Sequence, residues 1–383
     1  MSAEAKPSDK PARRPLFMKQ KVMLRMVYAL VPLLVSAIYF FGWRCLAVLG
    51  VCWGAGLVTE YITSRQRGQS ISMANFVTCW LLALSLPPLI PYWVAAVAAV
   101  VAVLFGKEVF GGFGRNFANP AIVGRAFVYV AFPVPMTAQF VPAFRGFPGG
   151  FAHWSFGSLG ELPAYIQRLP QYAELASKDV ADAVTQASPM WVVREFGRDA
   201  MLHGGSLWDD FLGTVGGVFQ TSGGDVRILA AGSMGEGCAL LIVLAAVYLL
   251  WTRTANWRLM AGGAIGLTAA TVLFRHLLGF DGLGGVPPLL FTLWTGTTLY
   301  AVVFMVTEPV SAPKRKGAIW AYSILIGFLV VTLRWRGVFV AAASFSILLG
   351  NIVGPLLDIA AEWWAARRKA RKGGKPAPAE EAA

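Results

Sequence analysis

The sequence has little charge: only 14% of its 383 residues are Asp, Glu, Lys or Arg, whereas 56% are hydrophobic. Soluble domains carry roughly a quarter charged residues, so this composition excludes an ordinary soluble domain. Histidine is scarce, with three in the chain, and the four cysteines form no CxxC pair. The spacings typical of a metal centre are therefore missing, and we expect the cysteines, which all lie in apolar stretches, to be buried thiols.

The sequence contains several long runs of apolar residues. A helix that crosses the hydrocarbon core of a bilayer needs about 20 predominantly apolar residues. Several ranges contain proline or glycine, and broken backbone at membrane depth is tolerated only where protein or a cavity satisfies its polar groups. We predict an all-α integral membrane protein with ten transmembrane helices, at residues 26–42, 45–61, 72–88, 90–106, 119–134, 228–251, 258–275, 286–306, 318–334 and 338–360.

The basic residues indicate how these helices are oriented. Most of the 33 lysines and arginines fall in the two terminal tails and in the loops that follow even-numbered spans. Because cytoplasmic loops are enriched in Lys and Arg, we expect both termini to face the cytoplasm. The net charge of +13 is concentrated beside the spans, which favours orientation and lipid contact over nucleic-acid binding.

One long polar stretch divides the predicted helices into two groups of five. An odd number of helices in each half means that the halves, if related, are inverted in the membrane. Inverted repeats with broken helices place small-molecule sites near the middle of the bilayer. We therefore divide the chain into a basic tail at 1–26, a first half at 27–134, an extracytoplasmic loop at 135–227, a second half at 228–360 and a second basic tail at 361–383.

Acidic residues near the predicted spans are candidates for an ion path. A charged side chain at the bilayer centre costs about 2.5–3.5 kcal/mol on insertion scales, so such residues are rare and usually functional. The candidates are Glu108, Glu236, Glu308 and Asp358. For Glu236 two interpretations stay open: a helix end where the carboxylate accepts backbone N–H groups, or a ligand of an ion or cofactor. The other three lie near span ends, where solvation by water is the alternative.

A polar, glycine-rich segment, KEVFGGFGRNFANPAIVGRAF, occupies residues 107–127. Gly111 and Gly112 would let the backbone approach a flat ligand, and Arg115 and Asn116 supply hydrogen-bond donors. We predict that these four residues bind a flat ligand. No strand precedes the glycines, so a Rossmann nucleotide site is excluded, and close helix packing through glycine is the alternative interpretation.

Five separated motifs occur in order along the chain: KEVFGGFGRNFANPAIVGRAFVYVAFP, GSMGEGCALLIVLAAVYLLW, WRLMAG, TEPVSAPKRKGAIWAYSILIG and NIVGPLLD. In these motifs the sequence resembles the NqrB/RnfD family, the flavin-bearing membrane subunits of ion-translocating NADH:quinone reductase (Nqr) and of the related Rnf complex. The resemblance covers roughly residues 70 to 360 and leans toward the Nqr member of the family. It implies ten helices in two inverted halves, in the inner membrane of a bacterium.

The resemblance also suggests a use for the long polar loop. The family attaches FMN through a phosphodiester bond to a threonine in a motif similar to DGxSGATxL. The segment DAVTQASPM, at residues 182–190, matches that motif in part. Ser188 falls where the acceptor threonine is expected, and Thr185 is the alternative hydroxyl. The segment departs from the motif at Gln186, which replaces glycine, and at the acceptor, so acceptance by a flavin transferase stays open.

The resemblance implies a membrane electron-transfer subunit of an ion-translocating NADH:quinone oxidoreductase, or of an Rnf-type ferredoxin:NAD oxidoreductase. The expected cofactors are covalent FMN and a second flavin (riboflavin or FMN), with quinone as electron acceptor. The resemblance makes Gly111, Gly112, Arg115 and Asn116 candidates for binding flavin or quinone. The expected partners are the other membrane, flavin and Fe–S subunits, a flavin transferase, membrane lipid, and Na⁺ or H⁺ as the transported ion. Composition alone fits a channel or transporter for a small solute equally well, and that protein would carry no covalent flavin.

Overall fold

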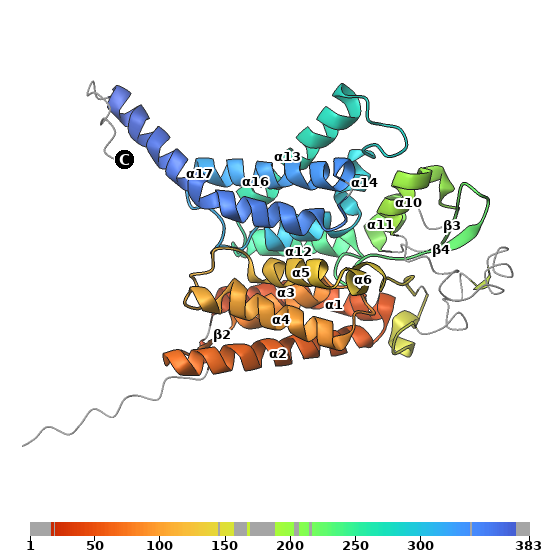
Figure 1. Cartoon of the computed structure of the whole chain (residues 1–383), viewed down its shortest axis with the longest axis horizontal. Coiled ribbons are helices and arrows are strands. Elements are labelled where there is room, and N and C mark those ends of the chain that lie inside the picture. The colour runs from red at the N-terminus through yellow and green to blue at the C-terminus, as the bar shows by residue number, and fades with distance from the viewer. Residues whose placement is uncertain are drawn as a thin grey trace, which may run out of the picture.

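The structure, a computed structural model, describes residues 17–18, 20–144, 146–156, 167–168, 188–202, 207–213, 217–337 and 339–372. These residues are mostly helical, with two small two-stranded sheets. Most of the helices lie side by side in two layers, with the helices up to α5 (red to yellow) in one layer and the last helices (blue) in the other (Figure 1).

The first layer contains α1 (Lys21–Phe41), α2 (Arg44–Arg67), α3 (Ala74–Leu84), α4 (Tyr92–Gly106) and α5 (Pro120–Ala131), with a short 3₁₀ turn η1 (Glu108–Phe110) before α5. The start of α5 follows from two adjacent residues. The Asn119 side chain accepts the backbone N–H of Ala121, and Pro120 occupies the first helical position, where its missing N–H costs nothing. This cap holds α5 at a defined depth within the layer.

The second layer contains α12 (Ala239–Trp251), α13 (Trp257–Thr271) with the π-helical η5 (Val272–Leu277), α14 (Leu289–Trp294), α15 (Thr297–Tyr300) with η6 (Ala301–Met305), α16 (Lys316–Val331) with η7 (Thr332–Arg336), and α17 (Ala342–Lys372). Glycines bring α13 and α16 into backbone contact. A Cβ atom on Gly266 would overlap the Ile324 carbonyl oxygen, and one on Gly327 would overlap that of Gly263. Small residues at such interfaces let membrane helices approach closely.

Shorter elements gather at one end of the helices, at the right of Figure 1: α6 (Pro133–Thr137), η2 (Gly149–Ala152), α10 (Pro189–Phe196), η4 (Arg198–Ala200), α11 (Leu207–Leu212), β3 (Gly217–Gln220) and β4 (Val226–Leu229). The antiparallel hairpin of β3 and β4 pairs Gly217 with Leu229. α10 packs on this hairpin through the buried Val192 and Phe219. At the other end, β1 (Phe17–Met18) pairs in parallel with β2 (Ile71–Ser72).

A continuous hydrophobic core joins the two layers. Leu30 and Leu82 of the first layer and Tyr300 and Phe304 of the second are almost completely buried in it. The four cysteines are free and buried, which confirms the expectation from sequence.

Six helices are long and apolar enough to cross a membrane, so the protein is a helical membrane protein. Three other apolar helices, α3, α5 and α12, have only 11, 12 and 13 residues. At 1.5 Å per residue these helices cover about 17–20 Å of a hydrocarbon core of about 30 Å. The count of ten spans and the inversion of the two halves stay predictions.

Three of the predicted spans differ from the helices that form. The range 228–251 is helical only from Ala239, because β4 extends to Leu229 and the following segment, AAGSMGEG, is rich in glycine, a poor helix former. The range 286–306 is interrupted at Gly296, which has a φ of 66°. The range 72–88 stops being helical at Leu84, shortly before two consecutive prolines.

Candidate functional site

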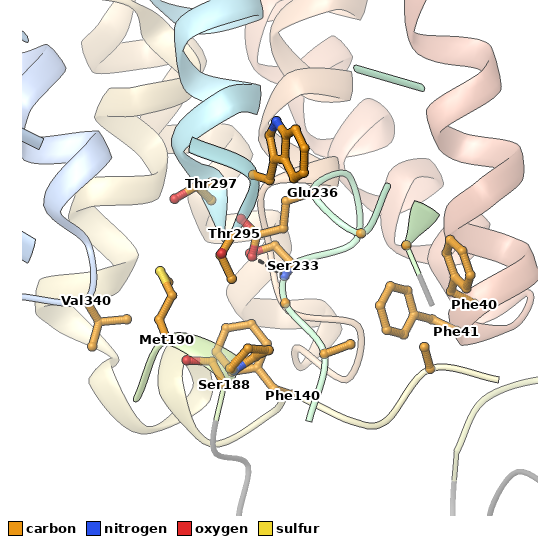
Figure 2. Close-up of a pocket in the computed structure, with 18 of the residues that line it drawn as sticks. Phe40, Phe41, Phe140, Ser188, Met190, Ser233, Glu236, Thr295, Thr297 and Val340 are labelled. Carbon is orange, nitrogen blue, oxygen red and sulfur yellow. Dashed lines mark hydrogen bonds between the residues drawn. The ribbon is translucent and has the colours of Figure 1, made fainter. Parts of the chain in front are cut away.

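Two non-helical segments meet at one cavity between the layers. One is residues 230–238, before α12, and the other is residues 294–296, between α14 and α15. The Gly235 N–H donates to the Leu84 carbonyl at 2.6 Å, so the break in the second layer satisfies the end of α3 in the first. In Figure 2, Ser188 and Met190 lie on one side of the cavity, and Glu236 and Thr297 lie on the other. The predicted tether residue therefore borders a mostly apolar cavity that is lined by broken helices and contains a few polar groups.

Ser188 occupies the N-cap position of α10. Its backbone is extended, its Oγ accepts the Trp191 N–H at 3.5 Å, and Pro189 takes the first helical position. The hydroxyl therefore sits at a helix N-terminus, where unpaired N–H groups and the helix dipole favour a phosphate. Thr185, the alternative attachment residue, lies outside the described residues.

Glu236 has one engaged carboxylate oxygen and one free one. Its Oε1 accepts the backbone N–H of Ser233, the contact drawn as a dashed line in Figure 2. Its Oε2 is buried and has no hydrogen-bond partner among the described residues. The backbone contact that we expected is present, and the second oxygen leaves room for a ligand.

Two buried arginines face Glu236. Arg125, on α5, lines the cavity, and Arg334, on η7, donates hydrogen bonds to the hydroxyls of Thr297, at 3.2 Å, and Thr298. The two arginines are 8% and 5% exposed. Glu236 is the carboxylate that interacts electrostatically with both, but neither guanidinium is within 4.0 Å of a carboxylate in the described part of the chain. The cavity region therefore holds an excess of positive charge.

A second cavity lies near the opposite end of α5 and brings Asn116 and Glu308 together. The Asn116 amide donates to the Ala118 carbonyl at 3.1 Å, and the Glu308 carboxylate accepts the Ser311 N–H at 2.7 Å and the Ser311 hydroxyl. Burial raises the pKa of Glu308, although the hydrogen bonds from Ser311 partly oppose the rise. Asn119 donates to the Met305 carbonyl at 3.0 Å, which fixes the wall between the two layers.

Glu108 belongs to a buried ionic network. Lys107 Nζ lies 2.8 Å from Glu60 and 3.5 Å from Glu108, and it donates to the Ser72 hydroxyl at 3.2 Å. Arg67 pairs with Glu108 at 3.0 Å. Lys107, Glu60 and Glu108 are only 2–3% exposed. The alternative that Glu108 is solvated is therefore wrong, because opposite charges hold it inside the protein.

The predicted glycines form a turn beside this network. Gly111 and Gly112 have φ angles of 106° and 95°, which only glycine adopts without strain. With Arg115 and Glu108 they line a third cavity. Close helix packing is thus the wrong interpretation of these glycines, because they lie in a turn after η1.

Asp358 lies apart from the three cavities. Its carboxylate accepts the backbone N–H groups of Lys314 and Arg315, each at 2.9 Å. This arrangement fixes the chain before α16 against α17.

Sequence reasoning missed Arg334, Lys107 and Glu60 as site residues. We counted Lys107 as a loop charge and placed Arg334 at the end of a span, because the rule for orientation weighs position along the chain and not burial. The available signal was an acidic residue, Glu60, inside an apolar run, since a buried carboxylate requires a partner.

Apolar helices that break around cavities between two layers define a polytopic helical membrane protein. The chain belongs to the NQR2, RnfD, RnfE family, whose model matches residues 8–363.

Three relatives are each 31% identical to the chain, and each is the B subunit of a Na(+)-translocating NADH-quinone reductase. The protein of Azotobacter vinelandii matches over 320 residues, 82% of this chain and 66% of the relative. That of Pseudomonas aeruginosa (strain LESB58) matches over 301 residues, 78% and 62%. That of Haemophilus influenzae (strain PittEE) matches over 339 residues, 86% and 68%. The chain thus spans about two thirds of the length of these relatives.

Proposed function

We propose that the chain is a membrane electron-transfer subunit of an ion-translocating NADH:quinone oxidoreductase, with FMN attached to Ser188. The relatives are subunits of Na(+)-translocating NADH-quinone reductase. The observation that carries the proposal is the position of the Ser188 hydroxyl, which lines a cavity between the layers together with the buried Arg125.

The residues that line this cavity suit a phosphate-linked flavin, whose ring would extend beyond the enclosed volume of about 60 Å³. The helix N-terminus at Ser188 suits a phosphodiester, and the buried Arg125 Nε and Glu236 Oε2 lack hydrogen-bond partners among the described residues. Phe40, Phe140 and other aromatic residues on the cavity wall offer stacking surfaces. Transfer of FMN from FAD would form the Oγ–P bond, break the pyrophosphate bond and release AMP and the hydroxyl proton. Bound flavin would supply one- and two-electron chemistry, while this chain orients the cofactor and excludes water.

The second cavity is our candidate for the second flavin, and the turn at Gly111 and Gly112 is our candidate for quinone. Asn119, the N-cap of α5 at the second cavity, and Arg125, on α5 at the first, lie six residues apart, about 9 Å along the helix axis. Redox groups in the two cavities would therefore be close neighbours. Glu236 and Glu308 supply cavity carboxylates for the ion path, whereas Glu108 is neutralised and Asp358 is engaged with backbone.

We also propose that the chain works with other subunits of such a complex, in a bacterial inner membrane with cytoplasmic termini. The segments with predicted cytoplasmic charges support this orientation, because β2 and the end of α17 lie at the same side of Figure 1, away from α10 and the hairpin. Cysteine accessibility to a membrane-impermeant reagent from each side would test it. Labelling of α10 from the cytoplasm would contradict it.

In-gel flavin fluorescence of the denatured protein tests the tether. Wild type co-expressed with a flavin transferase should fluoresce, Ser188→Ala should not, and Ser188→Thr should keep the signal because it retains the hydroxyl. Thr185→Ala is the matched control and should fluoresce. A dark wild type, or a fluorescent Ser188→Ala variant, would contradict attachment at Ser188, and the dark wild type would favour the solute transporter.

A further inference from the structure

A groove of about 740 Å³ runs between the start of α16 and the last turns of α17, outside the three cavities described above. Small side chains form its floor, among them Ala318, Ala321, Ala360 and Ala361. On α17 the lining residues recur every three or four positions, so they share one face of the helix. Half of the residues on this face are alanines. A Cβ atom on Gly317 would meet no atom within 4 Å, so the groove is open beside the first turn of α16.

The groove crosses the boundary of the bilayer. α16, a candidate membrane span, begins at Lys316, which places that residue at one surface. α17 has 31 residues and is about 46 Å long, against about 30 Å for the hydrocarbon core. Its last turns therefore extend into the headgroup region. Trp364, on these turns, is 66% exposed and lines the groove, as expected for a tryptophan at a membrane–water interface.

The net charge around the groove is positive. Arg315 is paired with Glu362 at 2.6 Å, and Asp358 is engaged with backbone N–H groups. Lys316 and Arg368 are exposed and line the groove from opposite helices, and their side chains make no hydrogen bond or ion pair with another described residue. Two cations thus flank the apolar groove at the level of the lipid headgroups.

We propose that this groove binds one anionic phospholipid. Lys316 and Arg368 hold the phosphate and acidic headgroup, an acyl chain lies along the alanines between α16 and α17, and Trp364 packs at the headgroup level. Basic pockets between membrane helices bind acidic lipids by this combination of charge and apolar surface. An acidic segment of a partner protein would use the two cations but would have no need of the alanine floor.

Native mass spectrometry tests the proposal with the full chain released from nanodiscs of phosphatidylcholine containing phosphatidylglycerol. Wild type should retain one phosphatidylglycerol in preference to phosphatidylcholine. The double variant Lys316→Gln/Arg368→Gln should retain phosphatidylglycerol about thirtyfold less, since each cation near an acidic lipid is worth on the order of 1 kcal/mol. The matched control, Arg65→Gln/Arg253→Gln, loses the same charge outside the groove and should retain lipid as wild type does.

A second variant, Ala361→Phe, keeps both cations but fills the floor, and it should also lose the lipid. Retention of phosphatidylglycerol by Ala361→Phe together with its loss in the charge variant would show that the cations hold the headgroup without an acyl chain on the alanine floor, and would overturn the proposal. Displacement of the lipid by glycerol phosphate at equal concentration would overturn it too. Equal retention of the two phospholipids by wild type, or unchanged preference in Lys316→Gln/Arg368→Gln, would likewise contradict it.

Discussion

Replacing Lys107 by methionine should destabilise the protein far more than removing an exposed cation. Lys107 Nζ is 2.8 Å from Glu60 and 3.5 Å from Glu108, and all three side chains are almost completely buried. Methionine keeps the apolar stem and removes the charge. Two buried carboxylates would then share one remaining cation, Arg67.

The expected loss of stability depends on the hydrogen bonds and ion pairs that the two carboxylates retain. Removing one partner of a buried ion pair costs about 3–5 kcal/mol. Glu60 would still accept the Ser72 N–H and hydroxyl, at 2.9 and 3.0 Å, and Glu108 would keep Arg67 at 3.0 Å. We therefore expect a loss near the lower limit, about 3 kcal/mol.

The control is the pair of Arg315 with Glu362, which is as short, at 2.6 Å, but more than half exposed on both sides. An exposed pair contributes roughly 0–1 kcal/mol, so Arg315→Gln should change stability little. Unfolding in mixed detergent–SDS micelles, followed by tryptophan fluorescence, measures both variants. Glu60→Gln should recover part of the stability lost in Lys107→Met, because it removes the unpaired charge. Equal losses for Lys107→Met and Arg315→Gln, or strict additivity of Lys107→Met with Glu60→Gln, would refute the reasoning.

Three further changes test other parts of the structure. Gly266→Leu should cost at least about 1–3 kcal/mol in the same titration, because its Cβ would overlap a carbonyl of α16, whereas Gly317→Ala, with open space, should cost nothing. Burial raises the pKa of Glu308, so the folded state binds more protons than the unfolded state and wild type loses stability as the pH rises above the ordinary glutamate pKa. Glu308→Gln should remove that decline in a series of unfolding titrations at different pH, and an unchanged decline would show that another group causes it. Arg125→Gln should lower the reduction potential of flavin on Ser188 by roughly 60 mV, a tenfold change in a one-electron equilibrium, in spectroelectrochemistry, and an unchanged potential would place the flavin ring away from this cation.

The sequence was sufficient to predict a helical membrane protein, since apolar runs and their flanking charges report directly on transfer into lipid. It left a helix end at Glu236 open as one of two interpretations, but the predicted span 228–251 ran through the glycines that precede α12. It was insufficient for the cavity itself. Arg125 and Arg334 interact electrostatically with Glu236 only because three segments distant in sequence are packed together, and no local pattern encodes that packing. Lys107 was misplaced for the same reason, because a charge beside a span can point into water or into the protein.

The buried cluster around Lys107 and the buried cluster around Ser188 differ in their net charge. That difference indicates a structural role for the first cluster and ligand binding for the second. Around Lys107, the cations of Lys107 and Arg67 face the carboxylates of Glu60 and Glu108, so the network is compensated without a ligand. Around Ser188, two buried arginines are accompanied by one carboxylate among the described residues, that of Glu236. An uncompensated buried charge costs several kilocalories per mole, so a chain retains one where an anion balances it during function. A phosphodiester or a reduced flavin beside Ser188 would supply that negative charge.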